Sequence, residues 1–178
     1  MDSKVIVKDH LISIYDLEGF VRITKKIKDT PENRGDGLFE FINNIQILTI
    51  KTLAEYDPVL IKNIGDANLM IFEPDNIDEK IKALIVLKQK LESYLKENGY
   101  NNKASFAAHY GEISVGEIGI EPFKFKDAFG DAINIAFKTN GKPFRGRFNI
   151  TPQLFRQLKD TRKLFHFIFM GKKQNVYS

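Results

Sequence analysis

The chain has 178 residues, of which 43% are hydrophobic and 28% are charged, a composition typical of a globular domain rather than a disordered segment. It contains no cysteine, which excludes disulfides, thiolate metal ligands and cysteine nucleophiles. The net charge of +4 is compatible with an anionic ligand, although a solvated lysine-rich surface accounts for most of it. No apolar run approaches the ~20 residues of a membrane span and no signal-peptide pattern follows Met1, so we expect a cytoplasmic protein that does not bind a membrane.

The first apolar segment, residues 10–16, predicts a strand that ends at Asp16. A helix is expected to begin near Gly19, so Asp16 and Glu18 fall at a junction between strand and helix. A helix N-terminus carries unpaired N–H groups and a partial positive charge, and it is therefore a favourable seat for phosphate. The alternative role for Asp16 is to cap that helix, which is common for aspartate at such a junction.

Two apolar runs, which enter from Val59 and leave at Phe72, flank Gly65 and Asp66 and predict a β-hairpin with a two-residue turn. A carboxylate at a rigid hairpin tip is well placed to bind a metal ion, and Lys62 lies on the strand that leads into the turn. The alternative is that Gly65 and Asp66 only supply good turn chemistry.

Amphipathic helices are predicted on both sides of this hairpin, from Leu38 to about Tyr56 and from Ile77 onward. Their apolar stripes predict core positions rather than a cofactor site. The core residues expected from this spacing are Leu38, Phe41, Ile42, Ile45 and Leu48 in the first helix and Ile77, Ile81, Leu84, Leu91 and Leu95 in the second.

The next part of the chain predicts a second hairpin, with strands over residues 104–110 and 113–119 and a turn at Gly111 and Glu112. His109 has the chemistry of a general base, but no partner is evident in the sequence, so a partly buried strand position is the preferred interpretation.

A short strand is expected over residues 123–127, followed by a helix that begins near Phe129 and has Ala132, Ile133, Ile135 and Ala136 as its apolar face. Asn134 and Lys138 share one face of this helix, because they are four residues apart. The basic loop 142–147 has no interleaved aromatic platform beyond Phe144 and Phe148, so we expect no nucleic-acid partner. Thr151 before Pro152 predicts the N-cap of a further short helix.

The order of these elements predicts one α+β domain over residues 1–178. It fits a ferredoxin-like βαββαβ core, in which a mostly antiparallel sheet carries helices on one face.

Four segments resemble the class III nucleotidyl cyclase catalytic domain, and the resemblance extends from about residue 10 to residue 173. The segments are 15–20 (YDLEGF), 62–67 (KNIGDA), 109–119 (HYGEISVGEIG) and 127–136 (DAFGDAINIA). The resemblance implies an enzyme that converts a nucleoside triphosphate to a 3′,5′-cyclic monophosphate and pyrophosphate.

The resemblance implies two divalent cations, Mg²⁺ or Mn²⁺, held by Asp16 and Asp66 with help from the carbonyl of Leu17. The start of the helix at Gly19 and Phe20 would then wrap the phosphates.

Base recognition in the family uses a lysine of the second segment and an aspartate of the fourth, which correspond to Lys62 and Asp127. This pair is of the adenine-reading type, so ATP is the expected substrate.

The transition-state residues of the family are an asparagine and, four residues later, an arginine; Asn134 matches the first and Lys138 replaces the second. Lysine keeps the charge but lacks the planar fork of arginine, so Arg145 or Arg147 is a candidate to take this role. The family often has a phosphate-contacting lysine just before a glycine near the C-terminus. This chain has Met170 there, with Lys172 and Lys173 as the nearby cations.

Each active site of the family is shared between two chains, of which one supplies the metal-binding residues and the other the base-reading residues and the asparagine. This chain carries both sets, so the resemblance implies a homodimer with two equivalent sites. Two alternatives to an ATP cyclase stay open. One is a cyclase for another nucleotide, either GTP or a pyrimidine triphosphate as in the cUMP- and cCMP-forming cyclases of anti-phage systems. The other is a catalytically weakened nucleotide-binding relative, which the changes at Lys138 and Met170 would explain.

Overall fold

The computed structural model describes residues 5–30, 36–141, 145–165, 167–169 and 175–177. The elements are β1 (Ile6–Leu17), α1 (Phe20–Asp29), α2 (Gly37–Leu53), a 3-10 turn (Ala54–Tyr56), β2 (Leu60–Ile64), β3 (Ala67–Phe72), α3 (Ile77–Glu97), β4 (Ala104–Ile118), β5 (Phe125–Phe129), α4 (Asp131–Asn140), β6 (Phe148–Ile150), α5 (Pro152–Gln157), a second 3-10 turn (Thr161–Leu164), β7 (Phe167–Phe169) and β8 (Asn175–Tyr177).

The described strands form one sheet in the order β2-β3-β1-β4-β6-β8-β7, and β5 pairs with the second half of β4. The β1 strand lies between β3 and β4 and is antiparallel to both, while β4 and β6 are parallel. The first part of the chain therefore follows the βαββαβ plan with spatial order β2-β3-β1-β4, which confirms the expected ferredoxin-like core.

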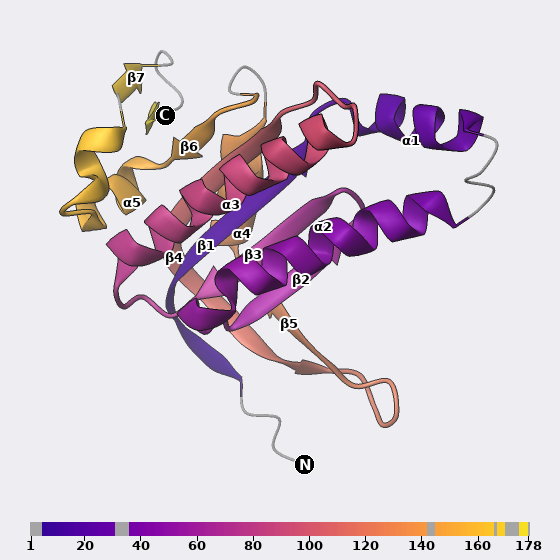
Figure 1. Cartoon of the computed structure of the whole chain (residues 1–178). Helices are drawn as coiled ribbons and strands as arrows, with labels where there is room; N and C mark the ends of the chain where they lie inside the picture. Colours follow the sequence, from indigo (N-terminus) through magenta and orange to yellow (C-terminus); the bar gives the residue numbers. More distant parts are fainter. Residues whose placement is uncertain (1–4, 31–35, 142–144, 166, 170–174, 178) are drawn as a thin grey trace.

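Helices cover both faces of the sheet (Figure 1). The α1, α2 and α3 helices pack on one face over a core that includes Leu11 and Tyr15 of β1, whereas α4 packs on the other face against Ile12 and Ile14. The expectation of helices on one face was therefore wrong. The physical reason is that β1 is apolar on both sides, so each side needs a helical cover.

The β4 strand runs without interruption from Ala104 to Ile118, so the predicted turn at Gly111 and Glu112 was wrong. Gly111 pairs with His10 in the β1–β4 ladder and does not have the positive φ of a turn glycine. A Cβ at Gly111 would lie 2.8 Å from Nε2 of His109 and 3.1 Å from Cβ of Ala132. The glycine therefore allows close packing inside a strand.

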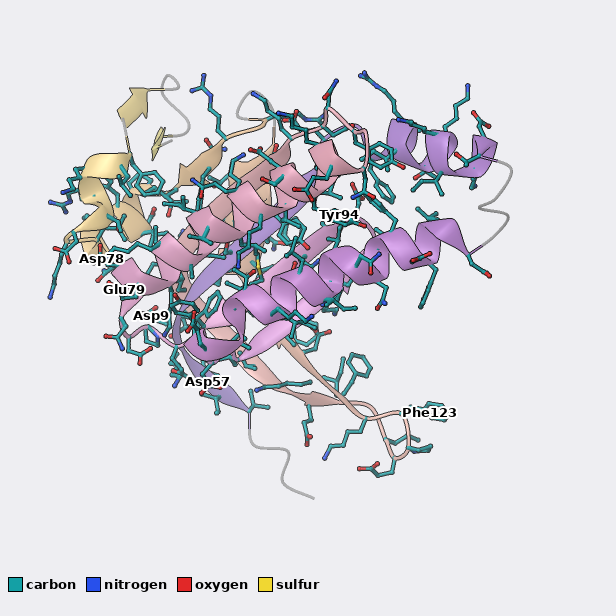
Figure 2. The ribbon with its side chains drawn as sticks, viewed as in Figure 1. Asp9, Asp57, Asp78, Glu79, Tyr94 and Phe123 are labelled. Carbon is teal, nitrogen blue, oxygen red and sulfur yellow. The ribbon has the colours of Figure 1, made fainter. Side chains whose placement is uncertain are left out.

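The hairpin of β4 and β5 extends away from the rest of the molecule, and Figure 2 shows Phe123 at its far end. The predicted strand over residues 123–127 is observed two residues later, as β5. No helix among the described residues is long and apolar enough to span a membrane.

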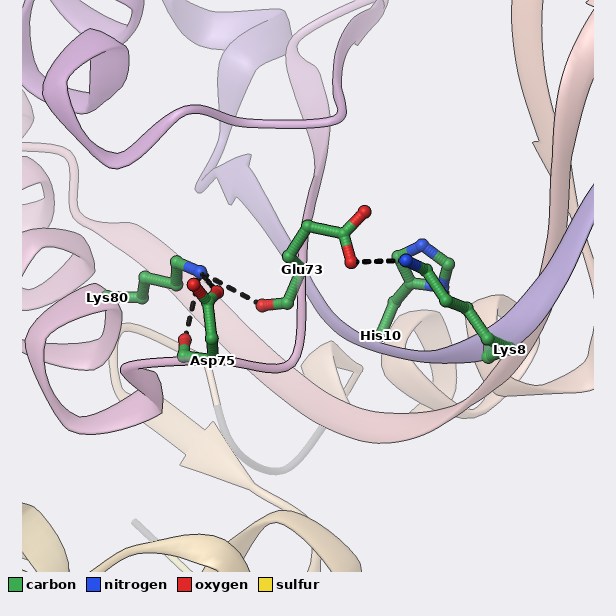
Figure 3. Close-up of polar contacts among 5 residues, drawn as sticks. All are labelled: Lys8, His10, Glu73, Asp75 and Lys80. Atoms are coloured by element: carbon green, nitrogen blue, oxygen red, sulfur yellow. Dashed lines mark hydrogen bonds and ion pairs between the residues drawn. The ribbon is translucent and has the colours of Figure 1, made fainter.

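The loop that follows β3 is held by the buried side chain of Lys80, which comes from the first turns of α3 (Figure 3). The ammonium group donates to the carbonyl oxygens of Glu73 and Asp75 at 3.0 and 2.9 Å and forms an ion pair with the Asp75 carboxylate. The Glu73 carboxylate pairs in turn with Lys8 of β1 at 2.6 Å. These contacts fasten the β3–α3 connection to the edge of the core.

Candidate active site

The two aspartates predicted to bind metal lie next to each other at one end of the sheet. Asp16 is near the end of β1, and Asp66 occupies the two-residue turn between β2 and β3, where Gly65 takes the required positive φ of 67°. The pairing of Tyr15 with Asn68 aligns the two strands, so that both carboxylates come together. The predicted hairpin is confirmed, and Asp16 is not a helix cap, because the N-cap position of α1 is Gly19.

A buried hydrogen-bond chain fixes this alignment. The Asn68 amide donates to the Tyr15 hydroxyl at 2.6 Å, and the hydroxyl groups of Tyr15 and Thr49 are 2.8 Å apart. Burial raises the pKa of Tyr15 to about 12, so the phenol stays protonated. Tyr15 and Asn68 flank the two aspartates and act as positioning residues; sequence reasoning missed them because they read as ordinary strand positions.

The electrostatics of the aspartate pair favour a cation. Burial and the neighbouring charge and hydrogen bond of Asp66 raise the pKa of Asp16 to about 6, while the attraction of Arg145 lowers it. Two adjacent carboxylates at neutral pH repel each other unless a proton or a positive ion lies between them. Their hard oxygen atoms are the ligands that Mg²⁺ and Mn²⁺ prefer, so the residues present fit a divalent cation. The described residues contain no group of three or more acidic, histidine or cysteine side chains that could compete as a metal site.

The start of α1 lies beside this acidic pair, as the sequence predicted. The helix begins at Phe20, directly after Gly19 with its positive φ of 64°, and no side chain caps its first turn. The Phe20 ring stacks on Phe41 at a centroid distance of 6.5 Å, which anchors the helix start to the core. Leu17, whose carbonyl the family resemblance assigns to the metal site, is buried at the end of β1. The free N–H groups of this turn are available to an anion.

The residues predicted to read the base form an ion pair. Nζ of Lys62 on β2 donates to Oδ2 of Asp127 on β5 at 2.7 Å, although these strands do not pair with each other. The Asp127 side chain is 8% exposed and that of Lys62 is 38% exposed. The other oxygen of Asp127 accepts from the N–H of Ala128 at 2.9 Å, which fixes the carboxylate. The structure thus brings together two residues that are 65 positions apart in the sequence.

Asn134 and Lys138 lie on the exposed face of α4. Their side chains have no hydrogen-bond or ion-pair partner within the described part of the chain. Phe129, Ile135 and Phe137, which surround them in the sequence, keep 55%, 38% and 37% of their surface exposed. Ile135 was expected on the buried face of the helix, and that expectation was wrong. The buried face of α4 is formed by Ala132, Ala136, Thr139 and Asn140, and Ile135 lies outside it.

Of the two arginines considered as replacements, Arg145 faces the metal end of the site, where its charge acts on Asp16. Arg147 contributes its carbonyl oxygen to the N–H of Phe106 at 2.8 Å, next to the short strand β6. The predictions for Met170, Lys172 and Lys173 lie outside the described residues.

His109 has a partner after all, because its Nδ1 lies 2.8 Å from the hydroxyl oxygen of Thr151. It is only 3% exposed, and burial lowers its pKa. Thr151 also caps α5 by accepting from the N–H of Leu154, which confirms the predicted N-cap. His109 is therefore a structural residue that links β4 to α5.

The comparisons with known proteins identify the family of this domain. The model of the adenylate and guanylate cyclase catalytic domain matches residues 9–175. The chain belongs to this family, the class III nucleotidyl cyclase catalytic domains.

Among curated proteins, an adenylate cyclase from Anabaena cylindrica is 25% identical over 131 residues, which cover 68% of this chain and 26% of that protein. The chain therefore spans about a quarter of the length of this relative.

Solved structures of cyclase domains share the fold at low sequence identity. The adenylyl cyclase CyaB from P. aeruginosa is similar with a TM-score of 0.76 at 14% identity, over 98% of this chain and 93% of that chain. The dimeric guanylyl cyclase domain of the RhoGC fusion protein from the aquatic fungus Blastocladiella emersonii gives a TM-score of 0.79 at 13% identity, over 98% and 97% of the two chains. At these identities the likeness establishes the fold alone, so the choice of substrate must be argued from the residues.

Proposed function

We propose that this chain is an adenylate cyclase, which converts ATP to 3′,5′-cyclic AMP and pyrophosphate at a site shared between two copies of the chain. The observation that carries the proposal is the ion pair of Lys62 and Asp127, at 2.7 Å. In the shared site, the pair of one copy would present one donor and one acceptor to the base, and the acidic pair of Asp16 and Asp66 of the other copy would form the opposite end. Adenine presents the complementary arrangement, because its N1 accepts a hydrogen bond and its 6-amino group donates one.

At the metal end, Asp16, Asp66 and the Leu17 carbonyl would hold two divalent cations, Mg²⁺ or Mn²⁺. Bound there, such ions supply Lewis acidity toward the ribose 3′-hydroxyl and the phosphates. The chain's own contribution is to hold the two carboxylates in register through Tyr15 and Asn68. The start of α1 at Gly19 and Phe20 would offer its N–H groups to the phosphates.

The copy of the chain that supplies Lys62 and Asp127 to a site would also supply Asn134 and Lys138, and the other copy would supply the metal-binding residues. Both side chains point away from their own sheet and lie among exposed apolar residues on α4, which is typical of a surface that another protein covers. In the shared site the Asn134 amide would orient the ribose. The Lys138 ammonium would neutralise charge that develops on the phosphate during displacement.

The direct test is to incubate the purified protein with ATP, GTP, UTP or CTP in the presence of Mn²⁺ and to identify the cyclic product by mass spectrometry. We expect 3′,5′-cyclic AMP from ATP as the main product and loss of product in the Asp66→Ala variant. A variant with an intact fold by circular dichroism and the wild-type rate would contradict the metal assignment.

The other outcomes separate the alternatives. A cyclic pyrimidine nucleotide or cyclic GMP as the main product would show that Lys62 and Asp127 do not select adenine. Measurable ATP binding without any cyclic product would identify a nucleotide-binding relative that has lost turnover, with Lys138 in place of arginine as the cause to examine first.

A further inference from the structure

A cavity of about 180 Å³ opens beside Asp16, between the end of β1 and the C-terminal end of α4 of the same chain. Its polar wall consists of Asp16, Asn140 and Arg145, and its apolar wall includes Ile14, Ala67 and Phe137. The family resemblance assigned a role to Asp16 and made Arg145 a candidate to replace the transition-state arginine, but it assigned no role to Asn140. The cavity borders the acidic pair, because Asp16 lines it and Ala67, the neighbour of Asp66 in the chain, lines it as well.

Asn140 is the last residue of α4 and only 8% exposed. Its Oδ1 atom is buried and has no hydrogen-bond partner among the residues that the structure describes. Buried side-chain oxygens nearly always have a donor, so this one is free to accept a hydrogen bond from a bound group or its water. The C-terminal end of a helix carries a partial negative charge, and together with the carboxylate of Asp16 it makes a cation or its bound water the favoured occupant.

Arg145 stands opposite on a segment that is fastened to the sheet. The N–H of its neighbour Gly146 donates to the hydroxyl of Ser105 at 2.7 Å, and this hydroxyl donates to Glu18 at 3.0 Å. The exposed side chain of Arg145 is therefore held near the end of β1, where its charge lowers the pKa of Asp16. Its guanidinium has the planar fork that binds phosphate oxygens in pairs.

We infer that this cavity extends the metal and triphosphate site within one chain, with Asn140 Oδ1 facing the hydrated divalent cation and Arg145 acting as an exchangeable counter-ion. In the free protein Arg145 faces Asp16. When Asp16 and Asp66 hold a cation, the charge of Asp16 would be balanced, and the Arg145 guanidinium would be free to contact the phosphates of the nucleotide. The inference rests on the proposed function, and it adds two residues of the same chain to the site.

Arg145 then has opposite effects on the two ligands. It repels a metal ion that arrives alone, because both are positively charged and both are attracted by Asp16. It favours the nucleotide that follows, because it contacts the phosphates. A residue with a merely structural role would weaken both binding steps together.

The experiment uses the full chain and measures Mn²⁺ binding alone, from the electron paramagnetic resonance signal of free Mn²⁺, and then binding of 3′-deoxy-ATP, which cannot cyclise. We expect Asn140→Leu to weaken Mn²⁺ binding about 10-fold and the isosteric Asn140→Asp to tighten it by a similar factor. We expect Arg145→Ala to tighten Mn²⁺ binding about 3-fold and to weaken 3′-deoxy-ATP binding about 10-fold, with partial recovery in Arg145→Lys. Arg156→Ala, an exposed arginine on α5, is the matched control and should change neither constant.

The inference is overturned if Asn140→Leu and Asn140→Asp both bind Mn²⁺ as the wild type does. It is equally overturned if Arg145→Ala moves metal and nucleotide binding in the same direction or leaves both unchanged. The asparagine variants act in opposite directions, so a folding defect cannot imitate the expected pattern. Wild-type protein whose Mn²⁺ binding is absent or unaffected by Asp66→Asn would overturn the proposed function and this inference with it.

Discussion

The two ends of the proposed nucleotide site, one for the base and one for the metal ions, differ in how their charges are balanced. At the base-reading end, Lys62 and Asp127 have opposite charges and already pair at 2.7 Å. At the metal end, Asp16 and Asp66 have the same charge, and burial together with Asp66 raises the pKa of Asp16 to about 6. The first end is therefore satisfied before substrate arrives, and a base must compete with an existing ion pair. The second end is unsatisfied and gains most from a bound cation.

The largest effect should follow from removing one of the like charges. We expect Asp66→Asn to lower the rate of cyclisation by more than about 100-fold, because the divalent cations lose a charged ligand. The same change should raise the melting temperature of the metal-free protein, since it removes the repulsion against Asp16. Rate assays and thermal unfolding, each with and without Mn²⁺, measure the two effects.

The comparison of melting temperatures with and without Mn²⁺ is the control for a general effect of the substitution on the fold. Added Mn²⁺ should raise the melting temperature of the wild type much more than that of Asp66→Asn. A variant that is less stable than the wild type without metal would show that Asp66 stabilises the fold rather than a cation site.

Substitution of Lys62, which already pairs with Asp127, should affect catalysis more than stability. We expect Lys62→Gln to lower kcat/KM for ATP by about 10- to 100-fold, because a charged hydrogen-bond donor to the base is lost. The stability of the free protein should fall by only about 1 kcal/mol, since the 38% exposed side chain of Lys62 is screened by water and the amide of glutamine can still donate to the 8% exposed carboxylate of Asp127. Steady-state kinetics and urea unfolding of the same preparations measure both quantities.

A matched substitution tests the assignment to the base. Lys126→Gln removes an exposed lysine from β5, next to Asp127 but outside the ion pair, and should leave the ATP to GTP preference unchanged. Equal losses for ATP and GTP in Lys62→Gln would mean that this lysine supports the fold or the phosphates rather than the choice of base.

The sequence was sufficient for the parts of the site that depend on local patterns. The hairpin around Gly65 and Asp66 follows from two apolar runs that flank two turn-forming residues. The strand-to-helix junction at Asp16 follows from the change between strand-type and helix-type spacing of the apolar residues. The pairing of Lys62 with Asp127 came from the family resemblance, since no local rule connects residues 65 positions apart.

The parts that failed depend on contacts that no local pattern records. Gly111 has the composition of a turn, but its lack of a side chain serves the packing of His109 and Ala132 within the continuous strand β4. The hydrogen bonds of Tyr15 and Asn68 cross between strands, so neither residue stands out in the sequence. The placement of α4 on the opposite face required knowing that both sides of β1 are buried.

A smaller change should come from the exposed face of α4. We expect Lys138→Arg to raise the rate of cyclisation about 3- to 10-fold. The planar guanidinium of arginine can contact two phosphate oxygens at once, whereas the lysine ammonium acts as a point charge. KM should change less than kcat if the contact forms mainly in the transition state. An unchanged kcat would indicate that another cation has taken over this role, and the double variant with Arg145→Ala identifies whether it is Arg145.

The smallest effect is expected at Asp78, a carboxylate outside the site. Its pKa is lowered, whereas that of Asp16 is raised. Asp78, at the start of α3 beside Glu79 (Figure 2), accepts hydrogen bonds from the N–H groups of Lys159 and Thr161 and from the Thr161 hydroxyl at 2.6–3.3 Å. Burial raises its pKa, but these hydrogen bonds outweigh burial and hold the pKa below its usual value of 3.8. The stabilisation is therefore complete well above that value and is lost as the pH falls through the lower pKa of the folded protein.

We expect Asp78→Asn to lower the free energy of unfolding by about 1 kcal/mol at pH 7, a modest loss because the carboxylate is partly exposed to water. The difference from the wild type should shrink at pH 3, where the wild-type carboxyl begins to protonate, and urea unfolding at pH 7, 5 and 3 measures it. Glu79→Gln, the exposed neighbour, is the control and should differ from the wild type by less than about 0.5 kcal/mol. A loss that does not depend on pH would show that the amide disturbs the hydrogen bonds regardless of charge, since asparagine is nearly isosteric with aspartate, and the contrast with Asp16 would then not be electrostatic.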